Sequence, residues 1–389
     1  MATNNNDKTL NVPHLRFPEF SGEWEIYPLT DFMSFKNGMN PDAKRFGRGT
    51  KFISVMDILN NQFICYDNIR ASVEVVDGDI ETYGVNYGDI LFQRSSETLE
   101  DVGQANVYLD SKPAVFGGFV IRGKSKSNYY PMFFRYLLAS PTARKKIIVK
   151  GAGAQHFNIG QDGLSKVCLN IPSIQEQEKI AKLFECIDTR IATQNKIIED
   201  LKKLKSAISL KMLHSDSWEQ FKIQDIASIG RGRVISSVEI SQQENPLYPV
   251  YSSQTSNDGI MGYLDDFMFE GEYISWTTDG ANAGTVFYRN GKFNCTNVCG
   301  LLKLKKGFDA HFVSLVLAEA TRMYVSTNLA NPKLMNNTMG NIQIRLPKLE
   351  EQKRISVVFR KLHGLLETHN SLIIKYSKQK QYLLSQMFI

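Results

Sequence analysis

An internal repeat constrains the fold of this chain more than any other feature. The stretches Ile171–Phe184 and Leu346–Phe359 share the pattern Pro-x-x-x-Glu-Gln, and 175 residues separate every matched pair of positions. The two copies of this motif are Pro172–Gln177 and Pro347–Gln352. A repeat of this kind indicates that the chain builds one structural unit twice.

An apolar seam follows each motif and predicts a long helix. Apolar residues step by three and four along both segments, which is typical of a coiled coil. Each helix should contain about 40 residues and span about 55–60 Å. Because each seam needs an apolar partner, we expect the two helices to pair with each other in antiparallel orientation, with Gln194 close to His369. The predicted seam positions are Ile180, Phe184, Ile187, Ile191, Gln194, Ile198 and Leu201 in the first helix and Ile355, Phe359, Leu362, Leu366, His369, Ile373 and Tyr376 in the second.

The first turn of each predicted helix carries polar residues that suit a helix start. Ser173 followed by Glu176 matches a capping box, whereas Lys348 takes the place of that serine in the second copy. Glu350 and Glu351 still favour a helix N-terminus through the helix dipole. We therefore interpret the glutamates of both motifs as capping and surface residues rather than as paired catalytic acids.

A second repeat opens each half of the chain. Trp24 is equivalent to Trp218, and Gly38 is equivalent to Gly232 at the same separation of 194 residues. Short β-prone runs then fill each half, and a short helical pattern comes late in each. The sequence predicts a mixed α/β (α+β) fold with a pseudo-two-fold. Its expected parts are an N-terminal tail (1–17), a first globular domain (18–173), a first long helix (174–214), a second globular domain (215–348) and a second long helix (349–389).

The sequence lacks the motifs of self-contained catalysis. It has no Walker motif and no Gly-x-Gly-x-x-Gly, its six histidines do not cluster, and its five cysteines include no Cys-x-x-Cys. We therefore predict no catalytic residue, no metal site and no cofactor bound by this chain. No segment approaches the ~20 apolar residues of a membrane span, and the N-terminus is polar, so we expect a cytoplasmic protein without a membrane partner.

Polar and basic loops at equivalent places in both halves are the candidate binding residues. Cations in a Gly-rich loop can reach a phosphate backbone, and donors and acceptors at strand ends can read base edges. The formal net charge of +6 is compatible with such a partner without being diagnostic. The candidates in the first half are Lys36, Lys44, Arg45, Arg48, Lys51, Arg94, Ser95, Ser96, Gln155, His156 and Asn158. Those in the second half are Arg231, Arg233, Ser252, Ser253, Gln254, Thr277, Thr278, Asp279 and Asn282.

Along nearly its whole length the chain resembles the specificity subunits of type I restriction–modification systems. The resemblance rests on the stretch Leu15–Glu25, on Gly38 and Gly232, and on the runs "YPVYSSQTSNDGI" and "WTTDGANAG". Its most specific element is the Pro-x-x-x-Glu-Gln motif, which occurs twice and each time follows a globular segment.

The resemblance implies a non-catalytic, DNA-reading subunit. Two target recognition domains, separated by the antiparallel helices, would each read one half of a bipartite double-stranded DNA site. The helices would set the spacer and dock two methyltransferase subunits and, through them, restriction subunits. S-adenosylmethionine would then bind the methyltransferase subunits, and ATP and Mg²⁺ would serve the restriction subunits. The N-terminal segment is expected to pack against the C-terminal end.

Two other classes of function stay open on the residues alone. The chain could be a self-contained methyltransferase or nuclease, although the motifs of both are missing. It could also be a duplicated coiled-coil scaffold that binds proteins and has no DNA specificity.

Overall fold

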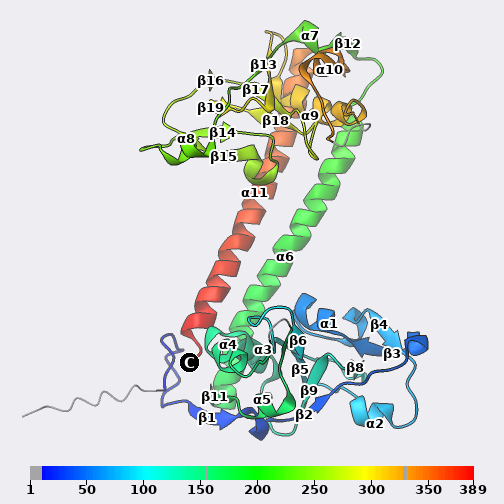
Figure 1. Cartoon of the computed structure of the whole chain (residues 1–389), viewed down its shortest axis with the longest axis vertical. Helices are drawn as coiled ribbons and strands as arrows, with labels where there is room; N and C mark the ends of the chain where they lie inside the picture. Colours follow the sequence, from blue (N-terminus) through cyan, green and yellow to red (C-terminus); the bar gives the residue numbers. More distant parts are fainter. Residues whose placement is uncertain (1–10, 154–155, 327–330) are drawn as a thin grey trace, which may run out of the picture. The chain divides into compact units, whose positions relative to one another are not determined.

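The computed structural model describes residues 11–153, 156–326 and 331–389 and divides into two compact units. The first unit comprises Met1–Asn195 with Ser371–Ile389, and the second comprises Lys196–Asn370. The two longest helices, α6 (Ile174–Met212) and α11 (Leu349–Gln386), each contribute one part to each unit (Figure 1).

The first unit contains a four-stranded antiparallel sheet and a smaller mixed sheet. The larger sheet has the order β2 (Met33–Asn37), β9 (Val120–Ser125), β5 (Ile90–Gln93), β7 (Ala105–Val107). The smaller has the order β4 (Ala71–Val73), β3 (Phe46–Ile53), β8 (Val115–Phe116), in which β3 and β8 run parallel. Two strand pairs complete it: β1 (Glu25–Pro28) with β11 (Cys168–Ile171), and β6 (Ser95–Ser96) with β10 (Phe157–Asn158). Its shorter helices are α1 (Val55–Asn60), α2 (Asp79–Tyr83), α3 (Pro131–Ala139), α4 (Pro141–Ile148) and α5 (Gln161–Ser165).

The second unit repeats this topology with one more strand, β16, in its mixed sheet. Its antiparallel sheet has the order β13 (Ala227–Arg231), β20 (Cys299–Leu304), β17 (Tyr273–Thr277), β18 (Val286–Arg289). Its mixed sheet has the order β15 (Ile260–Leu264), β14 (Tyr248–Tyr251), β19 (Lys292–Cys295), β16 (Phe269–Glu270), and β14 and β19 run parallel as β3 and β8 do. Strand β12 (Glu219–Lys222) pairs with β21 (Gln343–Leu346). The shorter helices are α7 (Ile223–Ile226), α8 (Ser237–Ser241), α9 (Ala310–Ala320) and α10 (Asn336–Asn341). The predicted mixed α/β fold with an internal repeat is thus confirmed.

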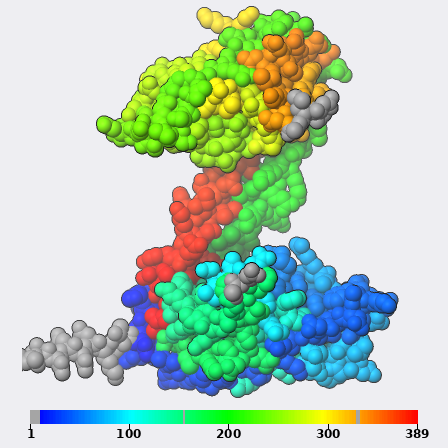
Figure 2. Space-filling view, in the orientation of Figure 1, coloured from blue at the N-terminus to red at the C-terminus, as the bar shows by residue number. Residues whose placement is uncertain are grey.

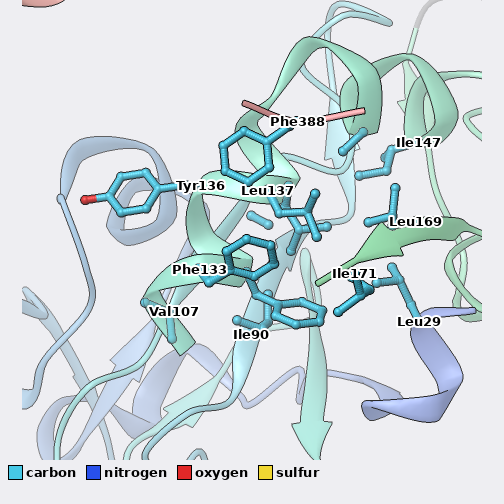
Figure 3. Packing of buried hydrophobic residues seen from close by; sticks show 14 of the residues in the cluster. Leu29, Ile90, Val107, Phe133, Tyr136, Leu137, Ile147, Leu169, Ile171 and Phe388 are labelled. Carbon is cyan, nitrogen blue, oxygen red and sulfur yellow. The ribbon is translucent and has the colours of Figure 1, made fainter. Parts of the chain in front are cut away.

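The main core of the first unit joins residues from both ends of the chain. Phe388, next to the end of α11, is 2% exposed and lies beside Leu137 and Phe133 of α3 (Figure 3). The ring centroids of Phe388 and Trp24 are 6.4 Å apart, and the backbone N–H of Leu15 donates to the carbonyl of Gln386 at 3.0 Å. The expectation that the N-terminal segment packs against the C-terminal end is therefore confirmed.

The long helices run antiparallel within the first unit. The ring centroid of Phe184 lies 5.8 Å from that of Phe388, and Asp188 forms an ion pair with Lys380 at 2.5 Å. A later residue of α6 therefore contacts an earlier residue of the C-terminal segment, as antiparallel helices require. Burial of the seam residues of both helices stabilises this pairing at roughly 25 cal/mol per Å² of apolar surface. The expected proximity of Gln194 and His369 stays a prediction.

The same antiparallel order holds inside the second unit. One hollow is lined by Met212 and Ile355, near the end of α6 and the start of α11. A second hollow is lined by Lys205 and His363, which lie earlier on α6 and later on α11. The apolar residues of both helices belong to one core with Trp276 and Phe312 of this unit.

The mixed sheet of each unit has small cores of its own. In the first unit, residues of β3, β4 and β8 form a cluster around Phe52, separate from the main core. This part lies on the side of the first unit away from the end of α11 (Figures 1 and 2). In each unit the antiparallel sheet therefore shares the main core with the long helices, whereas the strands of the mixed sheet lie outside that core.

The repeated glycines are required by a close approach of two backbone segments. A Cβ at Gly232 would lie 1.5 Å from the carbonyl oxygen of Cys295, and one at Gly38 would lie 2.1 Å from that of Gly117. No side chain fits there, because β13 and β2 end directly against the loop that follows the parallel strand of the mixed sheet. This steric limit explains why both halves carry glycine at this point.

Replacement of Gly232 by alanine should lower the free energy of unfolding of the second unit by about 1–3 kcal/mol, because the backbone must move to admit the methyl group. Hydrogen-exchange mass spectrometry of β13 and β19 over a denaturant series measures the effect. Gly230→Ala in the same strand is the matched control, since nothing lies within 4 Å of a Cβ there. Equal stability of the two variants would contradict the explanation.

Candidate functional site

The repeated glutamine joins each short helix to the start of each long helix. In the first unit Gln177 accepts a hydrogen bond from the backbone N–H of Tyr130 at 3.1 Å and donates to the carbonyl of Pro172 at 3.0 Å. In the second unit Gln352 accepts from the backbone N–H of Asp309 at 2.9 Å. It also donates to the carbonyl of Pro347 at 2.8 Å. Both side chains are buried, so this residue has a structural task that recurs in each copy.

The repeated glutamate has different surroundings in the two copies. Glu176 is 1% exposed, and its two carboxylate oxygens each accept a hydrogen bond from Arg16 at 2.8 Å. The indole N–H of Trp24 also donates to this carboxylate at 3.3 Å. The interpretation of Glu176 as a surface residue is therefore wrong, since an arginine distant in sequence buries it. The hydroxyl of Ser173 accepts from the backbone N–H of Glu176 as expected, whereas Glu351 is exposed.

The basic loop of the first unit lies around the start of β3, and most of its cations contact acceptors of the same unit. Arg45 forms an ion pair with Asp79, and Arg48 forms one with Glu74 at 2.7 Å. A hydrogen bond from the backbone N–H of Val76, followed by the contact with Arg45, lowers the pKa of Asp79. The loop is thus held against the segment that leads from β4 to α2.

The other three cations of this set differ in their contacts. Lys51 donates to the carbonyl of Ile69 at 2.7 Å, and the ammonium of Lys36 lies 5.4 Å from the ring centroid of Tyr83. Lys44 is exposed, and within the described ranges it forms no ion pair or side-chain hydrogen bond. It is the cation of this loop that is most available to a phosphate.

The strand pair β6–β10 contains three other candidates of the first unit, and two more flank it. Ser95 and Ser96 pair with Asn158 and Phe157, and the hydroxyl of Ser95 donates to the side-chain carbonyl of Asn158 at 2.5 Å. His156 is exposed directly before this pair, and Arg94 donates to the carbonyl of Gly118 at 3.2 Å. Gln155 lies outside the described residues. These side chains form one polar edge of the unit.

The two candidate arginines of the second unit are also held by neighbours. Arg231 donates from Nε to the side-chain oxygen of Asn336 at 2.9 Å. Arg233 forms an ion pair with Glu239, whose hydrogen bond raises the pKa of the guanidinium. Asn336 therefore holds the guanidinium of Arg231 in one orientation, and Glu239 partly balances the charge of Arg233.

Two predicted residues of the "WTTDGANAG" run lie inside the second unit. Thr277 and Thr278 are each 1% exposed, and the hydroxyl of Thr278 donates to the carbonyl of Val298 at 2.9 Å. The hydroxyl of Thr277 donates to the carbonyl of Asn282. The hydrogen bonds of both threonines therefore stabilise this loop from its buried side. Asp279 and Asn282 are the accessible polar residues among the four candidates of the run.

Arg289, which the sequence did not single out, organises the loop that carries Ser252, Ser253 and Gln254. Its side chain is 2% exposed, and its guanidinium lies 3.7 Å from the ring centroid of Tyr251. It forms an ion pair with Asp258 at 2.6 Å and donates to the hydroxyl of Ser275 at 3.0 Å. Asp258 has a positive φ of 53°, so the ion pair holds an unfavourable backbone conformation. Only the position of Arg289 at the end of an otherwise apolar strand could have indicated this role.

A histidine lies beside the glutamine contact of the second unit. Nδ1 of His311, on α9, is 2.8 Å from the hydroxyl of Ser356 on α11. Burial, followed by the nearby charge of Arg360, lowers the pKa of His311 to about 4. The imidazole is therefore neutral in the folded protein at neutral pH.

Within the part of the chain that the structure describes, no three His, Cys, Asp or Glu side chains are arranged to hold a metal ion. No helix in the described ranges combines the length and apolar character that crossing a bilayer requires.

Comparison with known proteins gives matches at the levels of family, sequence and fold. Residues 21–203 and 215–375 each match the family described as the type I restriction modification DNA specificity domain. A putative type I specificity subunit of Mycoplasma pneumoniae is 35% identical over 233 residues, which are 58% of this chain and 97% of that protein. The specificity subunit of the type I restriction enzyme MpnII of M. pneumoniae is 41% identical over 177 residues, which are 44% of this chain and 53% of that protein.

Two solved structures share the fold at low sequence identity. The crystal structure of a type I restriction–modification S subunit from M. genitalium has a TM-score of 0.67 and 15% identity, covering 97% of this chain and 99% of that one. A chain from a structure on complex assembly and conformational transition of the type I restriction–modification system has a TM-score of 0.55 and 12% identity. It covers 95% of this chain and 98% of that one.

The depressed pKa of His311 predicts a contribution to acid sensitivity. Between about pH 6.5 and pH 4 the unfolded chain binds a proton at this residue that the folded chain does not, so stability falls as the pH falls through this range. His311→Gln should reduce the loss by on the order of 1 kcal/mol, after allowance for solvent screening at this half-buried site. Denaturant unfolding at pH 7 and pH 4 measures the difference, with exposed His14→Gln as control. Equal acid losses in both variants would contradict the assignment.

Proposed function

Because the chain belongs to the family of type I restriction modification DNA specificity domains, we propose that it is the DNA-recognition subunit of a type I restriction–modification complex. Each unit reads one half of a bipartite double-stranded DNA target. The observation that carries this proposal is the double match of the family, once on each copy of the internal repeat.

The duplicated fold supports the reading of two half-sites. Each unit carries its own set of polar loops on the same topology, so each can contact one short stretch of bases. Two modest half-site readers in one chain gain affinity through effective concentration when the spacing of the target fits. Phosphate contacts position such a reader, and base contacts supply its specificity.

The remaining parts of the proposal concern partners. The long helices dock two methyltransferase subunits and, through them, restriction subunits, while this chain contributes no catalytic residue. S-adenosylmethionine belongs to the methyltransferase subunits, and ATP and Mg²⁺ belong to the restriction subunits. The fold shared with a chain from a type I complex structure supports this arrangement.

Removal of the cations of the basic loop should weaken DNA binding. We expect Lys44, Arg45 and Arg48 changed together to alanine to raise Kd several-fold and to flatten the dependence of log Kd on log salt concentration by about one to three counterions. The loss should be small per residue, because Asp79 and Glu74 already balance two of the charges. Fluorescence anisotropy with target duplex at several salt concentrations measures both quantities.

A control variant removes three exposed lysines of α11, Lys361, Lys375 and Lys378, and thus the same net charge. If both triple variants lowered affinity and salt slope equally, the effect would report overall charge and not the loop. Unchanged binding in the loop variant would show that the loop is only solvated.

Shortening both long helices should shorten the DNA spacer. Residues 191–197 and their repeat equivalents 366–372 each make one heptad, so their joint deletion keeps the apolar seam in step. Seven residues at 1.5 Å correspond to about three base pairs at 3.4 Å. Methylome sequencing of a host that carries the chain with its methyltransferase partner should show a split motif with unchanged halves and a spacer about three base pairs shorter.

A variant with Thr193 and Ser371 changed to alanine keeps the helix length and should keep the spacer. An unaltered spacer in the deletion variant would contradict the role of the helices. A host without any split motif would favour the alternative of a protein-binding scaffold that has no DNA specificity.

A further inference from the structure

The N-terminal segment occupies a defined seat in the first unit. This seat consists of Glu176, Lys179 and the surface beside Trp24. Arg16 binds the Glu176 carboxylate with two hydrogen bonds of 2.8 Å. The ring of Phe17 packs on the main core and lies 4.8 Å from the ammonium of Lys179. Lys179 also forms an ion pair with Glu19, so the segment is recognised as the pattern Arg-Phe-Pro-Glu.

The second unit contains the same seat by repetition. Glu351 and Arg354 are the equivalents of Glu176 and Lys179 at the separation of 175 residues, and Trp218 is the equivalent of Trp24. These three residues line an open groove of about 800 Å³ between the start of α11 and the end of α6. We call this surface the Glu351 groove.

The Glu351 groove has unsatisfied charges where the first seat has partners. Glu351 and Arg354 are exposed, and neither side chain forms an ion pair or a hydrogen bond with any residue in the described ranges. Trp218 is half-buried, whereas Trp24 is 2% exposed. The seat is therefore built in both units and filled by this chain in the first.

The connectivity explains the difference. In the first unit the chain reaches Trp24 through the segment 11–23, which crosses the seat. In the second unit it reaches Trp218 directly from α6 through Leu213–Ser217, and these few residues supply no arginine and no Phe, Tyr or Trp side chain. Among the described residues that line the groove, none takes the place that Arg16 and Phe17 take in the first unit.

We propose that the Glu351 groove binds an Arg–aromatic–x–acidic segment of a partner protein. The carboxylate of Glu351 receives the guanidinium, and Arg354 faces the acidic residue. The aromatic ring covers the apolar surface of Trp218, Met212 and Val358, which are partly exposed in the groove. The partner must supply the segment, because the chain's own copy is engaged with Glu176 in the first unit. Such a contact would give the second unit a protein-binding surface in addition to the reading of DNA.

The test uses the full-length chain and a fluorescent peptide of residues 11–23 as the probe. Anisotropy titration should show saturable binding of one peptide per chain. Glu351→Gln should weaken it about tenfold, as expected for the loss of a charge-assisted, two-point contact. Glu367→Gln, which changes an exposed glutamate of the same helix, is the matched control and should leave binding unchanged.

A charge exchange adds a specific readout. Arg354→Glu should weaken binding of the natural peptide, and a peptide with Glu19→Lys should restore it. Glu351 and Arg354 are both exposed, so the variants Glu351→Gln and Arg354→Glu should fold as the natural chain does.

Three outcomes would overturn the proposal. The first is the absence of saturable binding. The second is binding that Glu351→Gln and Arg354→Glu do not change, because the peptide would then be exchanging at the seat of the first unit. The third is self-association of the chain that Glu351→Gln abolishes in sedimentation velocity, because a second copy would then be the occupant. The assay contains no DNA, so its failure would leave the proposed function untouched.

Discussion

The buried glutamine of the Pro-x-x-x-Glu-Gln motif is the contact on which the architecture of each unit depends. It accepts from the backbone N–H of the residue directly before the short helix and donates to the carbonyl of the proline before the long helix. An apolar residue of similar size would leave both backbone groups unpaired, at a cost of about 1–3 kcal/mol each. One amide thus fixes the direction in which a long helix leaves a globular unit, and the chain uses it twice.

Much of the fold could be predicted from the sequence because of the internal repeat. A pattern that occurs at equivalent places in both halves supports the same helix or strand in each. The long helices, the short helices α3 and α9, and the strands β3, β5, β14, β17 and β18 follow from periodicity and turn residues. Pairing of strands distant in sequence, such as β3 with β8, could not be predicted, since no local pattern encodes it. The burial of Glu176 was missed for the same reason: its partner Arg16 lies 160 residues away.

The candidate site was predicted less well than the fold. Sequence identifies which residues are polar and in loops, but not which are already bonded to their own unit. Arg45 and Arg48 each have an acidic neighbour supplied by another segment, and Thr277 is turned into the interior. Arg289 shows the converse, because a residue without a motif determines the conformation of the loop that carries Ser252.

The stretches of sequence that make up each unit determine the order in which the two units can fold during synthesis. The second unit is one continuous stretch, Lys196–Asn370, and its core can close as soon as that stretch has left the ribosome. The core of the first unit includes Leu383, Met387 and Phe388, so it must wait for them although most of its sequence is made earlier. During translation the unit that is made first is therefore completed last. Until Leu383, Met387 and Phe388 have been made, its apolar core residues stay exposed, and in this period the chain most needs a chaperone.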